Sequence, residues 1–137
     1  MAEGMEERFE RRIDALDAVF AFMEEFFASR GISESNAFHA SFIVEELFTN
    51  AVKYSPGGKE IALELERKDD ELTIRLTDFG VEPFDPTGAP DVDTTLPLEA
   101  RKIGGLGLHL IKRMARDVSY DYKDKNSTIT IKMGLED

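Results

Sequence analysis

The sequence contains no cysteine among its 137 residues. Disulfide bonds and thiolate metal sites are therefore excluded, and an intracellular location fits this composition. Basic residues are also scarce, because 17 Lys and Arg stand against 28 Asp and Glu and give a formal net charge of −11. Such a charge repels phosphate backbones and anionic lipid head groups, so neither nucleic acid nor a membrane surface is an expected partner.

Long apolar runs are missing as well. No stretch approaches the length of a membrane span, and the first residues, "MAEGMEERFERR", lack the apolar segment of a signal peptide. We therefore expect a cytoplasmic protein. The length is typical of one domain, and 42% hydrophobic with 33% charged residues is the composition of a globular chain. We expect a single domain over residues 1–137.

The first half of the chain carries two helical patterns. Residues 13–27, "IDALDAVFAFMEEFF", repeat apolar side chains every three or four positions and predict an amphipathic helix. The preceding "ERFERR" is compatible with a short strand or with more helix. A second helix is predicted from the N-cap Ser33 to a stop at Pro56. The side chains expected to be buried are Ile13, Leu16, Val19, Phe20, Met23 and Phe27 in the first helix and Phe38, Phe42, Leu47 and Phe48 in the second.

The second half alternates strands with a loop and a helix. "KEIALELERK" and "ELTIRLTDFG" have period-two apolar patterns around a "DD" turn, which predicts a β-hairpin. Residues 81–103 show no periodicity and are rich in Pro, Asp and Thr, so we expect a functional loop or lid there. A third helix, "LHLIKRMARD", and two strands, "VSYDYK" and "STITIKM", follow. This order predicts an α+β two-layer sandwich, with an antiparallel or mixed sheet carrying helices on one face.

The second predicted helix carries a polar pair. Glu46 and Asn50 are four residues apart and share one face, with Lys53 beside Asn50. The simplest interpretation is the solvated side of an amphipathic helix. An Asn carbonyl oxygen is also a suitable partial ligand for Mg²⁺ on nucleotide phosphates, and a Glu one turn away could then act as a base.

A carboxylate and a glycine follow the predicted second strand. Asp78 ends that strand and Gly80 stands two residues later. The carboxylate there can accept a hydrogen bond from an exocyclic amine, and Gly80 lets the backbone approach a flat ring. An ordinary turn at the end of a strand is the alternative.

Three glycines precede the third predicted helix. Gly104, Gly105 and Gly107 would leave the first amides of that helix accessible to an anion such as a polyphosphate. A flexible hinge with a helix cap is the alternative. The segment is not a Walker A loop, because no Lys-Ser or Lys-Thr follows a Gly-x-x-x-x-Gly pattern.

Taken together, "VEELFTNAVKY", "DFGVEPFDP" and "GGLGLHLIKRMARDVSYDY" match the N box and the two glycine boxes of a known family. On these motifs the sequence resembles the GHKL ATPases, and within them the small anti-sigma-factor serine/threonine kinases with a histidine-kinase-like ATP-binding domain. The resemblance extends from about residue 13 to residue 133 and implies a Bergerat-type ATP-binding fold. Two departures are Val81 with Glu82, where one residue is usual, and Lys53 with Tyr54, where many anti-sigma kinases have a histidine.

The resemblance implies a role for each matching residue. Glu46 corresponds to the general base that takes the proton from an acceptor Ser or Thr hydroxyl. Asn50 corresponds to the residue that holds Mg²⁺ against the ATP phosphates. Asp78 corresponds to the adenine-reading aspartate, with Gly80 allowing close approach of the ring. The other implied nucleotide contacts are Lys53, Thr130 through water, and the phosphate-binding residues Gly104, Gly105, Leu106, Gly107 and Leu108.

The function implied by the resemblance is an ATP- and Mg²⁺-dependent protein kinase in a partner-switching system. Such a kinase binds a sigma factor and phosphorylates a STAS-type antagonist, without contacting nucleic acid directly, and by analogy acts as a homodimer. A second interpretation stays open, in which an ATP-binding module inhibits a protein partner without transferring phosphate. Glu46 favours the enzyme, because a pure nucleotide-binding module needs no base at that position.

Overall fold

The computed structural model describes residues 4–54, 59–80 and 111–136. The expected lid at 81–103 and the glycine segment 104–108 lie outside these residues. The described elements are β1 (Gly4–Glu10), the 3-10 helix η1 (Ile13–Ala15), α1 (Leu16–Arg30), α2 (Glu34–Tyr54), β2 (Glu60–Lys68), β3 (Glu71–Phe79), β4 (Asp117–Lys123) and β5 (Asn126–Gly134). Residues 111–114 are also helical and belong to the predicted third helix.

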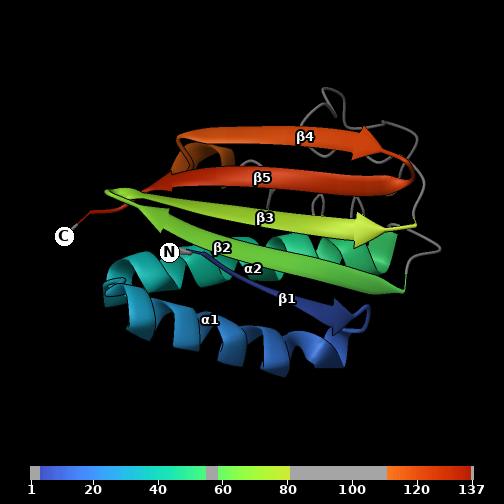
Figure 1. Cartoon of the computed structure of the whole chain (residues 1–137), viewed down its shortest axis with the longest axis horizontal. Helices are drawn as coiled ribbons and strands as arrows, with labels where there is room; N and C mark the ends of the chain where they lie inside the picture. The colour runs from blue at the N-terminus through green and yellow to red at the C-terminus, as the bar shows by residue number, and fades with distance from the viewer. Residues whose placement is uncertain (1–3, 55–58, 81–110, 137) are drawn as a thin grey trace, which may run out of the picture.

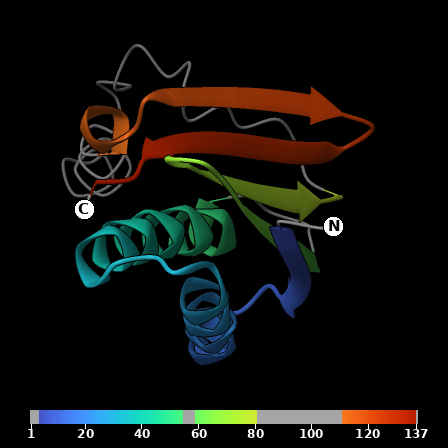
Figure 2. The ribbon, with the colours of Figure 1, turned by 60° about the vertical axis from the view of Figure 1, so that its left-hand side comes forward.

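The described strands form one antiparallel sheet in the order β1-β2-β3-β5-β4. Helices α1 and α2 lie together on one face of this sheet (Figures 1 and 2). The predicted α+β two-layer sandwich is therefore confirmed, with every described strand pair antiparallel. None of the helices in the described ranges is long and apolar enough to cross a membrane.

The ambiguous N-terminal segment is a strand. β1 pairs with β2 along its whole length and adds an edge to the sheet (Figure 1). Its inward side chains include Phe9, which is buried and meets Phe22 of α1 edge to face at 5.8 Å between ring centroids. The sequence could not decide between strand and helix, because only Met5 and Phe9 provide an apolar alternation in this short segment.

The first predicted helix is confirmed, although its buried face is rotated relative to the prediction. Ile13 lies in η1 and is 44% exposed, so the expectation that it is buried was wrong. The helix ends at Gly31, whose φ of 65° is a left-handed conformation that glycine adopts without strain. The buried side chains of α1 are Val19, Phe22, Met23, Phe26 and Phe27.

The second helix begins as predicted, because the Ser33 hydroxyl oxygen accepts a hydrogen bond from the backbone N–H of Asn36 at 3.4 Å. Phe38 is 72% exposed, so its predicted burial was wrong. The buried face of α2 begins at Ala40 and ends at Ala51, and its residues follow one another at helical spacing. The buried residues on this stripe are Ala40, Ile43, Val44, Leu47, Phe48 and Ala51.

The turn between β4 and β5 explains how the last two strands pair. Asp124 and Lys125 both have positive φ, at 53° and 66°, as a two-residue hairpin turn of this hand requires. The turn sets the register in which Ile129 and Ile131 reach the core. The two hairpins predicted from the sequence are both present.

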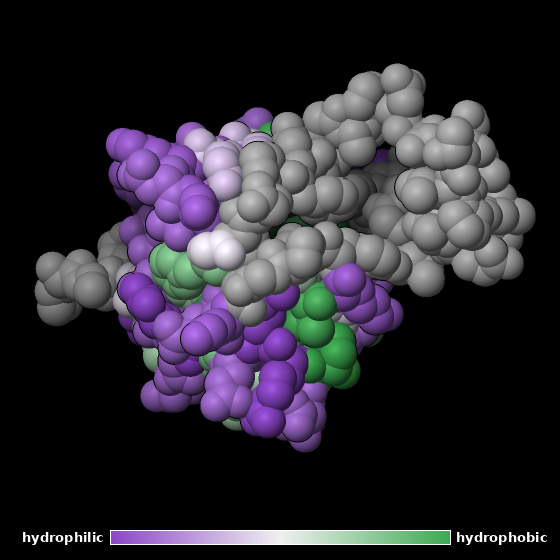
Figure 3. Space-filling view, turned by 90° about the vertical axis from the view of Figure 1, so that its right-hand side faces the viewer, coloured by the Kyte–Doolittle hydropathy of each residue, from purple (hydrophilic) through white to green (hydrophobic). Residues whose placement is uncertain are grey.

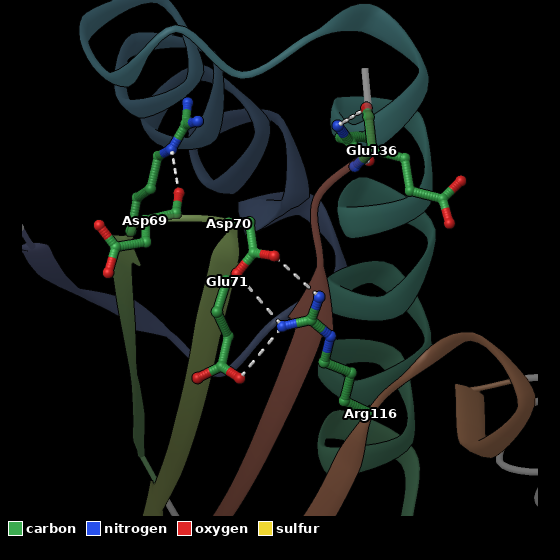
Figure 4. Close-up of polar contacts among 7 residues, drawn as sticks. Asp69, Asp70, Glu71, Arg116 and Glu136 are labelled. Carbon is green, nitrogen blue, oxygen red and sulfur yellow. Dashed lines mark hydrogen bonds and ion pairs between the residues drawn. The ribbon is translucent and has the colours of Figure 1, made fainter.

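An ion-pair cluster joins the β2–β3 turn to the start of β4 (Figure 4). The Arg116 guanidinium donates to the Asp70 carboxylate at 3.2 and 3.4 Å and lies 3.7 Å from a Glu71 oxygen. This guanidinium holds the pKa of the Asp70 carboxyl below its ordinary value of 3.8. The cluster lies at the end of β3 opposite to Asp78, so it is separate from the candidate site.

Candidate functional site

The structure places Glu46 and Asn50 on one flank of α2, beside its buried stripe. Both residues are half-buried and Lys53 is exposed. Residues seven apart share a helix face, so the flank continues to His39, which lines a pocket together with Met114 of the helical segment 111–114. The predicted pair is therefore partly shielded and does not lie on the fully solvated side of α2.

The charge surroundings of Glu46 suit a base. Burial raises the pKa of its carboxyl above the ordinary value of 4.5, the neighbouring Glu45 carboxylate raises it further, and Lys53 lowers it. A carboxylate with a raised pKa accepts a proton more readily than an ordinary glutamate. Glu46 can therefore act as a proton acceptor one helical turn from the Asn50 amide.

Asp78 lies at the end of β3, on the face of the sheet that α1 and α2 cover, and is buried. Gly80 follows with a φ of 68°, and a Cβ placed on it would meet no atom of the described residues within 4 Å. The end of the molecule at which β3 terminates shows a largely hydrophilic described surface, with hydrophobic patches (Figure 3). Among the described residues, nothing beside Gly80 would block a flat ring from approaching the backbone there.

Arg11 is a residue of this region that the sequence did not single out. Its Nε and Nη2 atoms donate to the two carboxylate oxygens of Asp78 at 3.0 Å each, and Nη2 also donates to the backbone carbonyl of Ala51 in α2. The side chains of Arg11 and Asp78 are only 8% and 4% exposed. The backbone N–H of Arg11 donates to the carbonyl of Lys59, so the pairing of β1 extends to Arg11. Arg11 therefore continues the alternation that turns Phe9 inward, and this alternation is the sequence pattern that could have identified it.

Thr130 does not lie where the sequence placed it. Directly paired residues of neighbouring strands share a face, and Thr130 pairs with Arg75, whose side chain points away from the helices. Ser127 is the β5 residue opposite Asp78. Ile129 and Ile131 are buried, so the odd-numbered residues of β5 face the core and the even-numbered residues, including Thr130, face outward. The same alternation in the sequence could have selected Ser127 in place of Thr130.

The chemistry of the donor set fits a magnesium ion held jointly with a nucleotide. Within residues 4–54, 59–80 and 111–136 there is no group of three or more His, Cys, Asp or Glu that could hold a metal ion by itself. Mg²⁺ bound with nucleotides takes few protein ligands and completes its octahedron with phosphate oxygens and water. The half-buried Asn50 amide oxygen is a suitable ligand of that kind.

A pocket of about 180 Å³ lies elsewhere in the described part of the molecule. It is formed where the start of α2 meets the end of β5, whereas Asp78 lies at the other end of β3. The pocket is therefore separate from the candidate site. Its lining residues are Ser35, Asn36, His39, Met114, Met133, Gly134 and Glu136.

Comparison with known proteins identifies relatives in sequence. The serine-protein kinases RsbW of Listeria monocytogenes and Listeria innocua are 33% and 32% identical to this chain over 95 residues. Each alignment covers 65% of this chain and 60% of the length of the kinase.

Solved structures share the fold at low sequence identity. The structure of the RsbU and RsbW domains of Rv1364c from Mycobacterium tuberculosis has a TM-score of 0.65 at 17% identity, over 96% of this chain and 32% of that chain. The SiaB–SiaC complex from Pseudomonas aeruginosa has a TM-score of 0.56 at 11% identity, over 96% and 89%.

The family model for the histidine kinase-like ATPase domain matches residues 9–133. This match begins within the last two residues of β1 and includes the described elements from η1 to β5, apart from Gly134 at the end of β5. The residues implied by the resemblance, from Glu46 to Thr130, all lie within it. The chain therefore belongs to the histidine kinase-like ATPase domain family.

Proposed function

We propose that this chain is an ATP-binding serine/threonine protein kinase that acts as an anti-sigma regulatory factor. The observation that carries the proposal is the position of Glu46, a carboxylate with a raised pKa, one helical turn from Asn50 on a half-buried flank of α2. The names of the RsbW relatives, which are serine-protein kinases, support the same activity.

The residues on the flank of α2 have different roles in phosphoryl transfer. The Asn50 amide oxygen holds the metal, and the Glu46 carboxylate accepts the proton that the acceptor hydroxyl loses. Lys53, exposed at the end of α2, adds positive charge near the phosphates. When bound, Mg²⁺ supplies further positive charge that neutralises the phosphate oxygens. Most of the catalysis in such a reaction comes from placement and charge neutralisation.

The end of β3 supplies the base-recognition part of the site. Asp78 accepts a hydrogen bond from the exocyclic amine of adenine, and Gly80 leaves room for the ring. Ser127, opposite Asp78, takes the water-mediated role first given to Thr130. The phosphate-binding residues in this proposal remain Gly104, Gly105, Leu106, Gly107 and Leu108.

The proposed partners are a sigma factor and a STAS-type antagonist, in the cytoplasm, with the kinase acting as a homodimer. The structural neighbour SiaB was solved in a complex with SiaC, so one chain of this fold binds a protein partner. The net charge of −11 favours encounter with a basic surface on the partner.

A second candidate is an ATP-binding module that inhibits its partner without transferring phosphate. Two departures from the family pattern favour it. They are the pair Val81 and Glu82, and the presence of Lys53 and Tyr54 where many anti-sigma kinases have a histidine shortly after the asparagine. In this second candidate the chain still binds ATP, but Glu46 does not act as a base.

The deciding experiment mixes the chain with Mg-ATP and a candidate STAS-type antagonist, followed by mass spectrometry of the antagonist. The kinase predicts a mass gain of one phosphate group that Glu46→Gln abolishes or strongly slows. Clear ATP binding by the wild-type chain without any mass gain would establish the binding module instead. Absence of ATP binding would contradict both candidates.

A further inference from the structure

Phe38 is a large apolar side chain that α2 leaves in contact with water. It is 72% exposed, and Ile13, at 44%, is the other exposed large apolar residue in the described part of the chain. A single apolar side chain on a surface is common and does not by itself indicate a binding site. The surroundings of Phe38 therefore decide whether it has a role.

The Phe38 ring adjoins the pocket at the start of α2. It stands edge to face against the imidazole of His39, with 5.9 Å between the ring centroids, and His39 lines that pocket of about 180 Å³. A drug-sized ligand needs about 300–1,000 Å³, whereas a cavity of about 150 Å³ can hold one benzene molecule. The pocket therefore has the size of one large apolar side chain.

The buried polar residue of the pocket is already satisfied within the chain. The Asn36 Nδ2 atom donates to the Ser33 hydroxyl at 2.8 Å and to the Glu136 carbonyl at 2.6 Å, and its Oδ1 atom accepts from the Glu136 N–H at 3.3 Å. Met114 and Met133 line the same pocket with flexible thioether side chains, which adapt to the shape of an apolar group. Asn36 therefore requires no polar ligand, and an apolar side chain fits against the two methionines.

Three exposed carboxylates belong to the surface that Phe38 and the pocket share. Glu34 and Glu45 lie four residues before and seven residues after Phe38, so they share its face of α2, and Glu136 lines the pocket. Among the ion pairs of the described residues, none involves these carboxylates. The Glu136 carboxylate also points away from Arg116 (Figure 4). A partner that covers this surface must therefore supply positive charge.

The basic residues near the pocket do not cancel this negative charge. Arg116 is already held by the ion-pair cluster of the β2–β3 turn. Ile111 is buried and Met114 lines the pocket, so this side of their helical turn faces inward. Lys112 and Arg113, which stand between them in the sequence, lie on the other side of the turn.

We propose that Phe38 and the adjacent pocket form a docking site for a protein partner with a basic surface, which places one large apolar side chain in the pocket and covers the Phe38 ring. Lysine or arginine side chains of the partner pair with Glu34, Glu45 and Glu136. The net charge of −11 disfavours a second copy of the chain as the occupant. The docking site and Asp78 lie at opposite ends of the sheet, so the inference does not rest on the proposed function.

The first test is an NMR titration of the full chain with a capped peptide in which lysines flank one phenylalanine on both sides. The signals of His39, Met114 and Met133 should shift and saturate. Replacing the peptide's phenylalanine with alanine should weaken binding about tenfold, on the scale of an interface anchor. Replacing its lysines with glutamates should abolish the shifts. Equal binding of the phenylalanine and alanine peptides, or saturation without shifts at these three residues, would overturn the proposal.

The second test compares Phe38→Ala with Ile13→Ala, which removes the other exposed large apolar side chain of the described residues. Phe38→Ala should weaken binding of the phenylalanine peptide about fivefold or more, as for a residue that contributes to an interface, and Ile13→Ala should change it less than about twofold. Phe38→Ala should keep the wild-type affinity for Mg-ATP. Equal peptide affinities in the two variants would overturn the docking site alone, whereas a wild-type chain that binds the peptide but no ATP would overturn the proposed function alone.

Sedimentation analysis of Phe38→Ala tests the alternative occupant. The proposal predicts that this variant has the same association state as the wild-type chain at equal concentration. A wild-type dimer that becomes a monomer in Phe38→Ala would assign the surface to a second copy of the chain and overturn the inference.

Discussion

Ser127 lies directly opposite Asp78 in the β3–β5 pair, on the same face of the sheet as the buried Ile129 and Ile131. Thr130, three residues along the same strand, lies on the other face. The register therefore decides which hydroxyl lies beside the carboxylate proposed to bind the nucleobase.

We predict that Ser127→Ala weakens Mg-ATP binding severalfold, on the scale of about 1 kcal/mol for one hydrogen bond. Thr130→Val is the matched control, and isothermal titration of both variants checks the assignment. A larger loss with Thr130→Val would contradict it.

The two polar residues of α2 should separate binding from transfer. Asn50→Ala removes the proposed metal ligand, so we expect Mg-ATP affinity to fall at least about tenfold, as when a metal site loses one of its supporting side chains. Glu46→Gln keeps the shape of the side chain and removes the base, so ATP affinity should stay near wild type while phosphoryl transfer slows by about 100-fold or more. Single-turnover kinetics together with titration would measure both effects. Equal losses of affinity in the two variants would contradict this division.

The pH dependence of transfer follows from the raised pKa of Glu46. A base must be ionised, so the rate should fall as the pH drops through a pKa that lies above 4.5. Glu45→Gln removes a neighbouring negative charge that raises this pKa. The acidic limb of the rate profile should therefore move to lower pH in Glu45→Gln. A shift to higher pH, or none, would mean that Glu46 is not the titrating group.

Two phenylalanines of α2 offer a matched test of the fold. Phe48 is 1% exposed in the core and Phe38 is 72% exposed. We expect Phe48→Ala to lower the free energy of unfolding by about 3–5 kcal/mol, as for a buried aromatic side chain. Phe38→Ala should change it by less than about 0.5 kcal/mol. Urea denaturation followed by circular dichroism measures both, and similar losses for the two variants would contradict the placement of the core.

Much of the fold follows from short-range patterns in the sequence. Apolar periodicity predicted both long helices and all four strands after residue 59, and the N-cap at Ser33 was confirmed. The predicted burial of Ile13 and Phe38 was wrong, because hydrophobicity does not show which side of a broad apolar stripe meets the sheet. β1 was left undecided, since its residues pair with β2 residues that are 50 (Glu10 with Glu60) to 62 (Gly4 with Glu66) positions away, and pairing at that distance leaves no local pattern.

The candidate site was predictable in part for the same reason. Glu46 and Asn50 lie one helical turn apart, and Asp78 with Gly80 ends a strand, so local spacing was sufficient to bring each set together. Arg11 reaches Asp78 across 67 residues and depends on the order of strands β1, β2 and β3. The alternation of β1 could place Arg11 on the inner face, but its contact with Asp78 could be recognised only once the tertiary structure was known. The assignments at 104–108 lie outside the described residues and stay predictions.

The central claim is that Asp78 and the α2 flank form two parts of one ATP site. A crystal structure of the chain with Mg²⁺ and a nonhydrolysable ATP analogue tests this most directly. The claim predicts the adenine amine within hydrogen-bond distance of Asp78, with Arg11 still bound to that carboxylate, and the Asn50 oxygen on the metal. An analogue bound elsewhere, or none bound beside Asp78 at saturating concentration, would contradict it.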